Sequence, residues 1–174
     1  MLIESYYNDK ILQIGINGLT NMELNEFCLD LADKNGILVY EVTKEYLHEY
    51  HKQLKIKYFS DVCEQTIVEG FVSTTNGNQY RLNRDDQLNL LGKYTFVKED
   101  TDVTVVYWKA ENLGMQIPHT KEEFLSIVKE GFEHKEKTLY KLDQLRKRVR
   151  ECLTDSEILA VYWDQPETVE EPAA

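Results

Sequence analysis

One segment constrains this chain more than any other, because residues 121–152 predict a single long helix. Thr120-Lys-Glu-Glu123 has the pattern of a capping box, in which the threonine and the glutamate each accept a hydrogen bond from the other's backbone N–H. Apolar residues then recur at steps of three and four as far as Cys152, which is the spacing of one helix face. At 1.5 Å per residue the helix would be about 45 Å long, so the rest of the chain must pack along it or leave part of it to a partner.

The second half of this predicted helix carries a short apolar seam. Its members alternate steps of three and four residues, close to the a/d pattern of a coiled coil, and are Leu139, Leu142, Leu145 and Val149. A seam of about two heptads is short for a coiled coil, so two interpretations stay open. The seam packs either on the chain's own domain or on a partner, which includes a second copy of the chain. These four residues are the candidate protein interface.

Upstream of the long helix, the sequence predicts a hairpin, a short helix and a strand. Asn76-Gly77 lies between two strand-like runs, and Asn-Gly in that position is a strong hairpin signal. Asn83 is placed to cap the short helix that follows. The run 102–108 is rich in β-branched and aromatic residues and predicts a strand, with 115–117 pairing back onto it.

The first 66 residues predict a ββαβα module. Its two opening strands are separated by Asn8-Asp9, residues that suit tight turns, and its first helix begins with a capping box from Thr20 to Glu23. In chain order the module comprises strands over 2–7 and 10–16, a helix ending at Asn35-Gly36, a strand over 37–42 and a helix over 44–65.

Together these elements predict an α+β fold: a short mixed or antiparallel sheet with helices, a C-terminal hairpin–helix–strand unit and one long C-terminal helix. We place a domain boundary near residue 66, which gives an N-terminal α/β module over 1–66 and a second domain over 67–163. A capping box beginning at Thr154 predicts a short final helix that runs through Trp163. Residues 164–174 are acidic and contain two prolines, which predicts a disordered tail.

The charge balance narrows the classes of partner. A formal net charge of −11 disfavours binding to phosphate backbones and anionic membranes, so we expect neither a nucleic-acid nor a membrane partner. No apolar run approaches the roughly 20 residues of a membrane span, and the N-terminus lacks the pattern of a signal peptide. Three widely spaced cysteines without a Cys-x-x-Cys pair indicate a reducing compartment rather than a disulfide framework or a zinc site.

Motifs that carry chemistry are weak in this sequence. His48-Glu-Tyr-His51 spaces its histidines three residues apart, whereas the zinc-protease motif needs four, so we interpret the pair as a solvated helix face. Asp85-Asp86 resembles a carboxylate pair but falls at a predicted helix start, where acidic residues favour the helix dipole. Neither a nucleophile elbow nor a phosphate-binding loop is present. We therefore expect no enzyme activity, no cofactor and no metal.

Residues 67–163 resemble a domain of unknown function found in tailed-phage and prophage proteins, often encoded near tail-fibre genes. The resemblance lies in the order of a β-hairpin, a short helix, a strand, a capped long helix and a threonine-capped final turn. The residues that carry it are Val68-Glu-Gly-Phe-Val-Ser73, Gly77-Asn-Gln-Tyr-Arg-Leu-Asn83, Asp85-Asp-Gln-Leu-Asn-Leu-Leu91, Val106-Tyr-Trp-Lys109, Phe124, His134-Lys135, Leu142, Leu145 and Thr154-Asp-Ser-Glu-Ile158.

This resemblance implies a non-enzymatic role in a bacteriophage tail, baseplate or fibre. The expected partners are other tail or fibre proteins, with a homo-oligomer as a further expectation. The resemblance implies a location in the host cytoplasm during assembly or in the virion tail. An assembly chaperone for tail fibres is the first alternative, and a phage inhibitor of a host system is the second.

Overall fold

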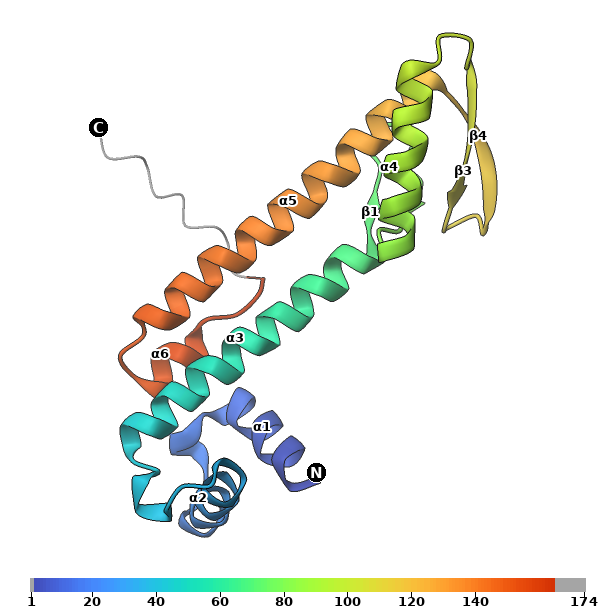
Figure 1. Cartoon of the computed structure of the whole chain (residues 1–174). Helices are drawn as coiled ribbons and strands as arrows, with labels where there is room; N and C mark the ends of the chain where they lie inside the picture. The colour runs from blue at the N-terminus through green and yellow to red at the C-terminus, as the bar shows by residue number, and fades with distance from the viewer. Residues whose placement is uncertain (1, 165–174) are drawn as a thin grey trace, which may run out of the picture. The chain divides into compact units, whose positions relative to one another are not determined.

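The structure is a computed structural model that describes residues 2–164, with side chains from Tyr6 onward (Figure 1). Most of the chain is helical, and its strands form two separate antiparallel two-stranded sheets, which confirms the predicted α+β class. The predicted disordered tail begins at Asp164, and residues 165–174 lie outside the described residues. In chain order the elements are α1 (Leu2–Ile14), η1 (Ile16–Gly18), α2 (Asn21–Asn35), η2 (Val39–Glu41), α3 (Lys44–Glu69), β1 (Phe71–Val72), β2 (Gln79–Tyr80), α4 (Arg84–Glu99), β3 (Val105–Ala110), β4 (Met115–Thr120), α5 (Lys121–Glu151) and α6 (Asp155–Ala160).

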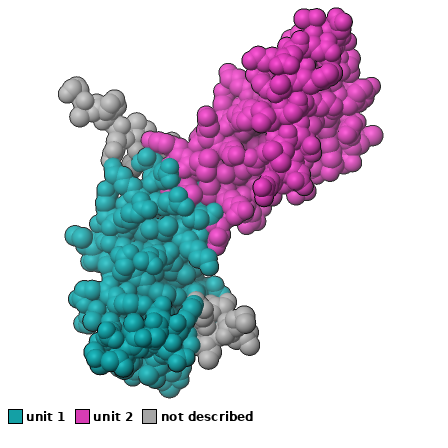
Figure 2. All heavy atoms as spheres, viewed as in Figure 1, with its two compact units in different colours: residues 1–60, 143–174 teal, residues 61–142 magenta. Residues whose placement is uncertain are grey.

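The chain divides into two compact units, shown in different colours in Figure 2. Unit 1 contains residues 1–60 and 143–174, and unit 2 contains residues 61–142. Both α3 and α5 contribute residues to each unit. Compactness is a different property from independent folding, so the domain boundary near residue 66 stays a prediction.

The predicted strands of the first 66 residues are wrong. Residues 2–14 form one helix, α1, and Asn8-Asp9 lies inside it rather than in a turn. Tyr7 and Ile11, four residues apart, are both buried in the unit 1 core, so a helical face satisfies their packing. The predicted strand over 37–42 is also wrong: the 3₁₀ turn η2 lies there, and the Glu41 carboxylate closes it by accepting from the Leu38 N–H at 2.7 Å.

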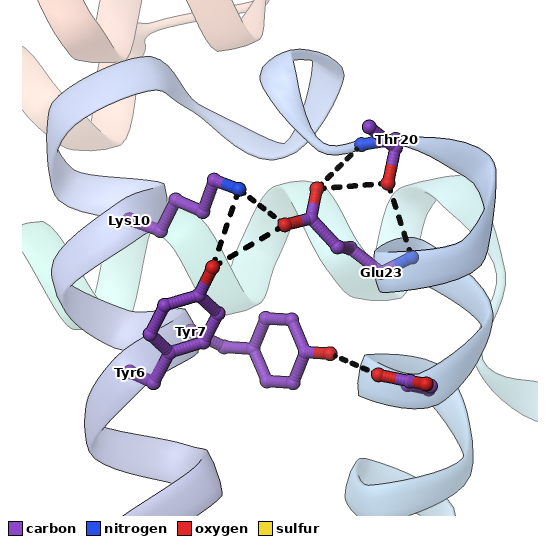
Figure 3. A network of polar contacts seen from close by, with 6 residues as sticks. Tyr6, Tyr7, Lys10, Thr20 and Glu23 are labelled. Carbon is purple, nitrogen blue, oxygen red and sulfur yellow. Dashed lines mark hydrogen bonds and ion pairs between the residues drawn. The ribbon is translucent and has the colours of Figure 1, made fainter.

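The capping box that begins α2 is confirmed and joins a wider polar network (Figure 3). The Glu23 carboxylate accepts from the Thr20 N–H at 2.9 Å and also pairs with Lys10 of α1. The Lys10 ammonium, followed by the Thr20 donors, lowers the pKa of Glu23 to about 2. Tyr7 donates its hydroxyl to Glu26 at 2.7 Å, and this bond to a carboxylate raises the pKa of Tyr7 to about 12. The network fixes α1 against α2.

The core of unit 1 is apolar and built mainly from its N-terminal elements. Phe27 lies between two tyrosine rings, with centroids 5.4 Å from Tyr7 and 5.3 Å from Tyr50 of α3. The buried members of this cluster are Tyr7, Ile11, Ile16, Leu19, Phe27, Leu31, Ala32, Val42 and Leu47.

Unit 2 contains both sheets, and its hairpin prediction at Asn76-Gly77 is confirmed. The strands β1 and β2 pair Phe71 with Tyr80, and the loop between them is anchored on α5. There the Glu130 carboxylate accepts hydrogen bonds from three loop hydroxyls, those of Ser73 at 2.5 Å, Thr74 at 2.5 Å and Thr75 at 3.0 Å. These three hydroxyls lower the pKa of Glu130 against the opposing effect of its burial.

The strands β3 and β4 confirm the second predicted pairing and form a six-residue ribbon. Val106 and Ala110 point inward and are buried, whereas Val105 and Tyr107 alternate with them and are exposed. The helix α5 follows at once, and its predicted start and end are confirmed to within one residue. Gly131 has a packing reason in mid-helix, because a Cβ there would lie 3.1 Å from the Phe71 ring.

Candidate protein-binding surface

The four predicted interface residues lie in different environments. Leu142, Leu145 and Val149 are buried, with 5%, 4% and 0% of their surface exposed. Leu139 is 41% exposed. Most of the predicted seam therefore packs within the chain itself, and of the four only Leu139 offers apolar surface to a partner.

The two histidines of α3 make structural contacts rather than facing solvent as predicted. His51 is fully buried, and its Nδ1 lies 2.6 Å from the carboxylate of Asp155 at the start of α6. The same carboxylate accepts from the backbone N–H groups of Ile16 and Asn17, each at 3.1 Å. His48 Nε2 lies 3.3 Å from the carbonyl oxygen of Cys152. We call His51, Asp155 and the two η1 N–H groups the carboxylate latch.

The burial of His51 in the latch favours its neutral form. It lowers the pKa of His51, and this effect exceeds the opposing influence of Asp155. The Nε2 atom of His51 has no hydrogen-bond partner among the described residues, so a second ring proton there would be a buried donor without an acceptor. A neutral imidazole that donates from Nδ1 to Asp155 fits both observations. The latch joins three segments and has the chemistry of a structural contact.

The Asp85-Asp86 pair lies in the first turn of α4, as the helix-start interpretation predicts. The Asn83 side chain accepts from the Asp86 N–H at 2.8 Å and caps the helix. Burial raises the pKa of Asp86. The predicted helix is thus confirmed, but it extends to Glu99 and is longer than its apolar residues had indicated.

The exposed apolar surface of α4 was not among the features predicted from the sequence. One side of the helix packs inward through Leu90 and Val97, which are 5% and 1% exposed. Other sides leave large apolar residues open, and these are Leu88, Leu91 and Phe96. A helix that is apolar on several sides has more surface to cover than its own unit supplies.

Polar contacts hold α4 firmly in unit 2. Lys93 donates to the carbonyl oxygen of Tyr107 in β3 at 3.1 Å. Gln87 donates to the Leu82 carbonyl at 2.6 Å and accepts from Lys135 of α5 at 2.5 Å. The exposed apolar side chains therefore stand on an anchored helix.

The first of two hollows beside α4 lies toward the ribbon and has a volume of about 760 Å³. We call it the ribbon groove. It combines apolar and aromatic surface with charges of both signs, and it is lined by Arg81, Asp86, Leu88, Asn89, Gly92, Lys93, Phe96, Trp108, Lys109, Glu111 and Gln116. Lys109 and Glu111 form an ion pair at 2.9 Å.

The second hollow lies between α4 and α5 and has a volume of about 510 Å³. We call it the helix groove. Its floor is apolar and its rim is charged, and it is lined by Leu91, Tyr94, Lys98, Leu125, Val128, Lys129, Phe132, Glu133 and Glu136. No residue lines both grooves, because they use different faces of α4. A sequence signal did exist, since Leu88, Leu90 and Leu91 cannot all lie on one helix face.

The described residues form neither a metal site nor a membrane span. Among them, no group of three or more His, Cys, Asp or Glu side chains is placed to hold a metal ion. Likewise, no helix within residues 2–164 is both long and apolar enough to cross a membrane.

Comparison with known proteins gives one match. A family model described as "Domain of unknown function (DUF4376)" matches residues 50–164, which is more than half of the chain. The match includes all of unit 2 and both grooves, whereas α1, η1, α2 and η2 lie outside it. No curated protein and no solved structure matches the chain.

Proposed function

This chain belongs to the DUF4376 family, a domain of unknown function, and we propose that it is a non-enzymatic protein that binds other proteins in a bacteriophage tail. The observation that carries the protein-binding part is the ribbon groove, which leaves apolar and aromatic side chains open on an anchored helix. The bacteriophage setting rests on the resemblance of residues 67–163 to tail-associated domains.

The composition of the ribbon groove suits a protein segment. Binding energy in protein interfaces concentrates on aromatic residues and arginine, which sit among contacts that exclude water. Phe96, Trp108 and Arg81 provide these residue types within one groove. Lys93 and Glu111 add charges of opposite sign, which would orient a partner and select against others.

Binding is favoured over catalysis because two of the three basic groups that line the groove have structural partners. Lys93 is hydrogen-bonded to the Tyr107 carbonyl, and Lys109 is paired with Glu111. A catalytic site needs a nucleophile or base that can reach its substrate with a suitable pKa. The groove presents apolar surface with fixed charges around it, an arrangement typical of a docking site.

The proposal is tested by purification of the tagged full chain from cells infected by the phage that encodes it. We expect a tail, baseplate or fibre protein to co-purify with the wild type. Leu88→Ser combined with Phe96→Ser should abolish that co-purification, because both side chains line the groove. Leu29→Ser is the matched control, since Leu29 is an equally exposed leucine in unit 1. Retention of the tail protein by the double variant would overturn the role of the groove.

A second measurement separates a component of the tail from an assembly chaperone. Quantitative mass spectrometry of purified particles should find the chain at a fixed ratio to tail proteins. Absence from particles, together with abundance in the infected-cell lysate, would contradict the structural role and favour the chaperone.

A further inference from the structure

The helix groove continues into an apolar stripe along α5. Leu125, Phe132 and Leu139 are spaced seven residues apart, so they lie on one line along the helix. Leu125 is half-buried, whereas Phe132 and Leu139 are 46% and 41% exposed. The stripe lies beside the buried face of α5, where Val128 is covered. A heptad line with this exposure has the pattern of a helix seam that lacks its second helix.

We propose that the helix groove binds a second copy of this chain, with the two α5 helices antiparallel and Phe132 facing Phe132 of the other copy. Leu125 and Leu139 are each seven residues from Phe132. The antiparallel arrangement therefore sets Leu125 of one copy level with Leu139 of the other, twice across a two-fold axis. Leu91 and Tyr94 of α4 would then cover the outer side of the incoming helix.

The charges that flank the stripe select this arrangement. Lys129 and Glu136 each follow a stripe residue by four positions, so both lie on the same side of it. Lys129 is three residues before Phe132, and Glu136 is four residues after it. When Phe132 faces Phe132 in an antiparallel pair, Lys129 of one copy is therefore level with position 135 of the other, one residue from Glu136. In a parallel pair, Lys129 would lie level with Lys129, and Glu136 with Glu136. The antiparallel arrangement makes two ion pairs where the parallel one makes none.

Both charged side chains are exposed and can reach a partner chain. The Lys129 side chain is 76% exposed, and its pair with Glu133, at 3.5 Å, is an exposed contact within one helix turn. Glu136 is exposed as well. Lys129 and Glu136 cannot reach each other within one helix, because seven residues separate them by about 10 Å along the axis. Any coupling between them must therefore arise between two chains.

The inference goes beyond the proposed function, because it concerns another face of α4 and another partner. Its first test is the mass of the full chain in solution, by sedimentation and light scattering over a range of concentrations. We expect a dimer that Phe132→Glu converts to a monomer. Phe96→Glu is the matched control on the ribbon groove and should leave the dimer intact. A wild-type chain that stays monomeric up to about 100-fold above the usual micromolar working range would overturn the proposal.

Charge exchange tests the orientation of the two helices. Lys129→Glu or Glu136→Lys alone should weaken the dimer at least tenfold, since each places like charges opposite one another. The double variant should restore most of the wild-type affinity, because the pairs form again with reversed signs. Circular dichroism checks that helix content is unchanged. A double variant as weak as either single variant would contradict the antiparallel pairing.

Disulfide cross-linking gives an independent readout. A mixture of Leu125→Cys and Leu139→Cys chains should form a cross-linked dimer under mild oxidation, because these positions face each other. Neither variant alone should cross-link beyond the wild type, which provides the baseline for the native cysteines. Cross-linking of Leu125→Cys with itself would indicate a parallel pair and overturn the arrangement.

Discussion

Two features, one from unit 1 and one from unit 2, place polar and apolar groups in opposite ways. In unit 1 a charged group is turned inward, where the Asp155 carboxylate meets His51 and the backbone of η1. In unit 2 apolar groups are turned outward, where Leu91 and Phe132 stand open beside the helix groove. The latch therefore adds buried polar contacts to the apolar core of unit 1, whereas unit 2 leaves apolar surface that its own contacts do not cover.

The sharpest test of this comparison uses two adjacent leucines of α4. Leu90 is 5% exposed and Leu91 is 50% exposed. Leu90→Ala should lower the free energy of unfolding by about 2 to 5 kcal/mol, because it leaves a cavity in the core. Leu91→Ala should cost less than about 1 kcal/mol, since its side chain is already half in water. Urea denaturation measures both, and equal losses would show that the outer face of α4 is structural.

Asp155→Ala tests the inward charge of unit 1. We expect a loss of about 3 kcal/mol, because the change leaves the buried His51 and the Ile16 N–H without their acceptor, whereas the exposed Asn17 N–H can bond to water. Asp85→Ala is the control at the start of another helix and should cost about 0.5 kcal/mol through the helix dipole. A loss as small as that of the control would mean that water replaces the latch contacts.

Two glycines of unit 2 differ in whether their position tolerates a side chain. Gly70 has φ +81°, and a Cβ there would lie 1.8 Å from the Tyr80 carbonyl oxygen. Gly70→Ala should therefore cost about 2 kcal/mol in strain. Gly92 lies within α4 with open space around it, so Gly92→Ala should stabilise the protein by about 0.5 kcal/mol. Thermal denaturation of the two variants should shift the midpoint in opposite directions.

The smallest expected effect is the pH dependence that His51 of the latch gives to the free energy of unfolding. The pKa of His51 is lowered in the folded state, so the unfolded chain binds the proton more readily. The stability that the neutral His51 contributes to the folded state is fully present above the ordinary pKa of 6.5, and it is lost as the pH falls below that value. His51→Asn keeps a donor for Asp155 but cannot titrate. Denaturation at pH 7.5 and pH 5 should show a larger acid loss for the wild type than for this variant, and equal losses would contradict a neutral His51.

Local signals in the sequence predicted local structure well. The side chains of Thr20, Thr120 and Thr154 each accept the expected bond from the N–H three residues on, and at Thr20 the reciprocal bond of the capping box is present as well. The Asn76-Gly77 hairpin and the β3–β4 pairing were predicted for the same reason. Each depends on groups a few residues apart, so the chain carries the information within one short window.

Features that depend on distant packing were not predictable. Helix α1 places the Tyr7 ring against Phe27 and Ile11 in the same buried cluster, and no pattern within residues 2–16 specifies this packing. The latch joins His51 to Asp155 across 104 positions of the chain. Both grooves arise where α4 meets other elements, so their linings are scattered along the sequence.

The latch has a consequence for the order in which a growing chain acquires structure. Ile16 and Asn17 are made before residue 155, whose carboxylate accepts hydrogen bonds from their N–H groups. Residues 61–142, by contrast, are continuous in sequence and form one compact unit. Since structure forms from the N-terminus during synthesis, we expect the contacts of Ile16 and Asn17 with the latch to form only after residue 155 has been made, later than contacts within residues 61–142.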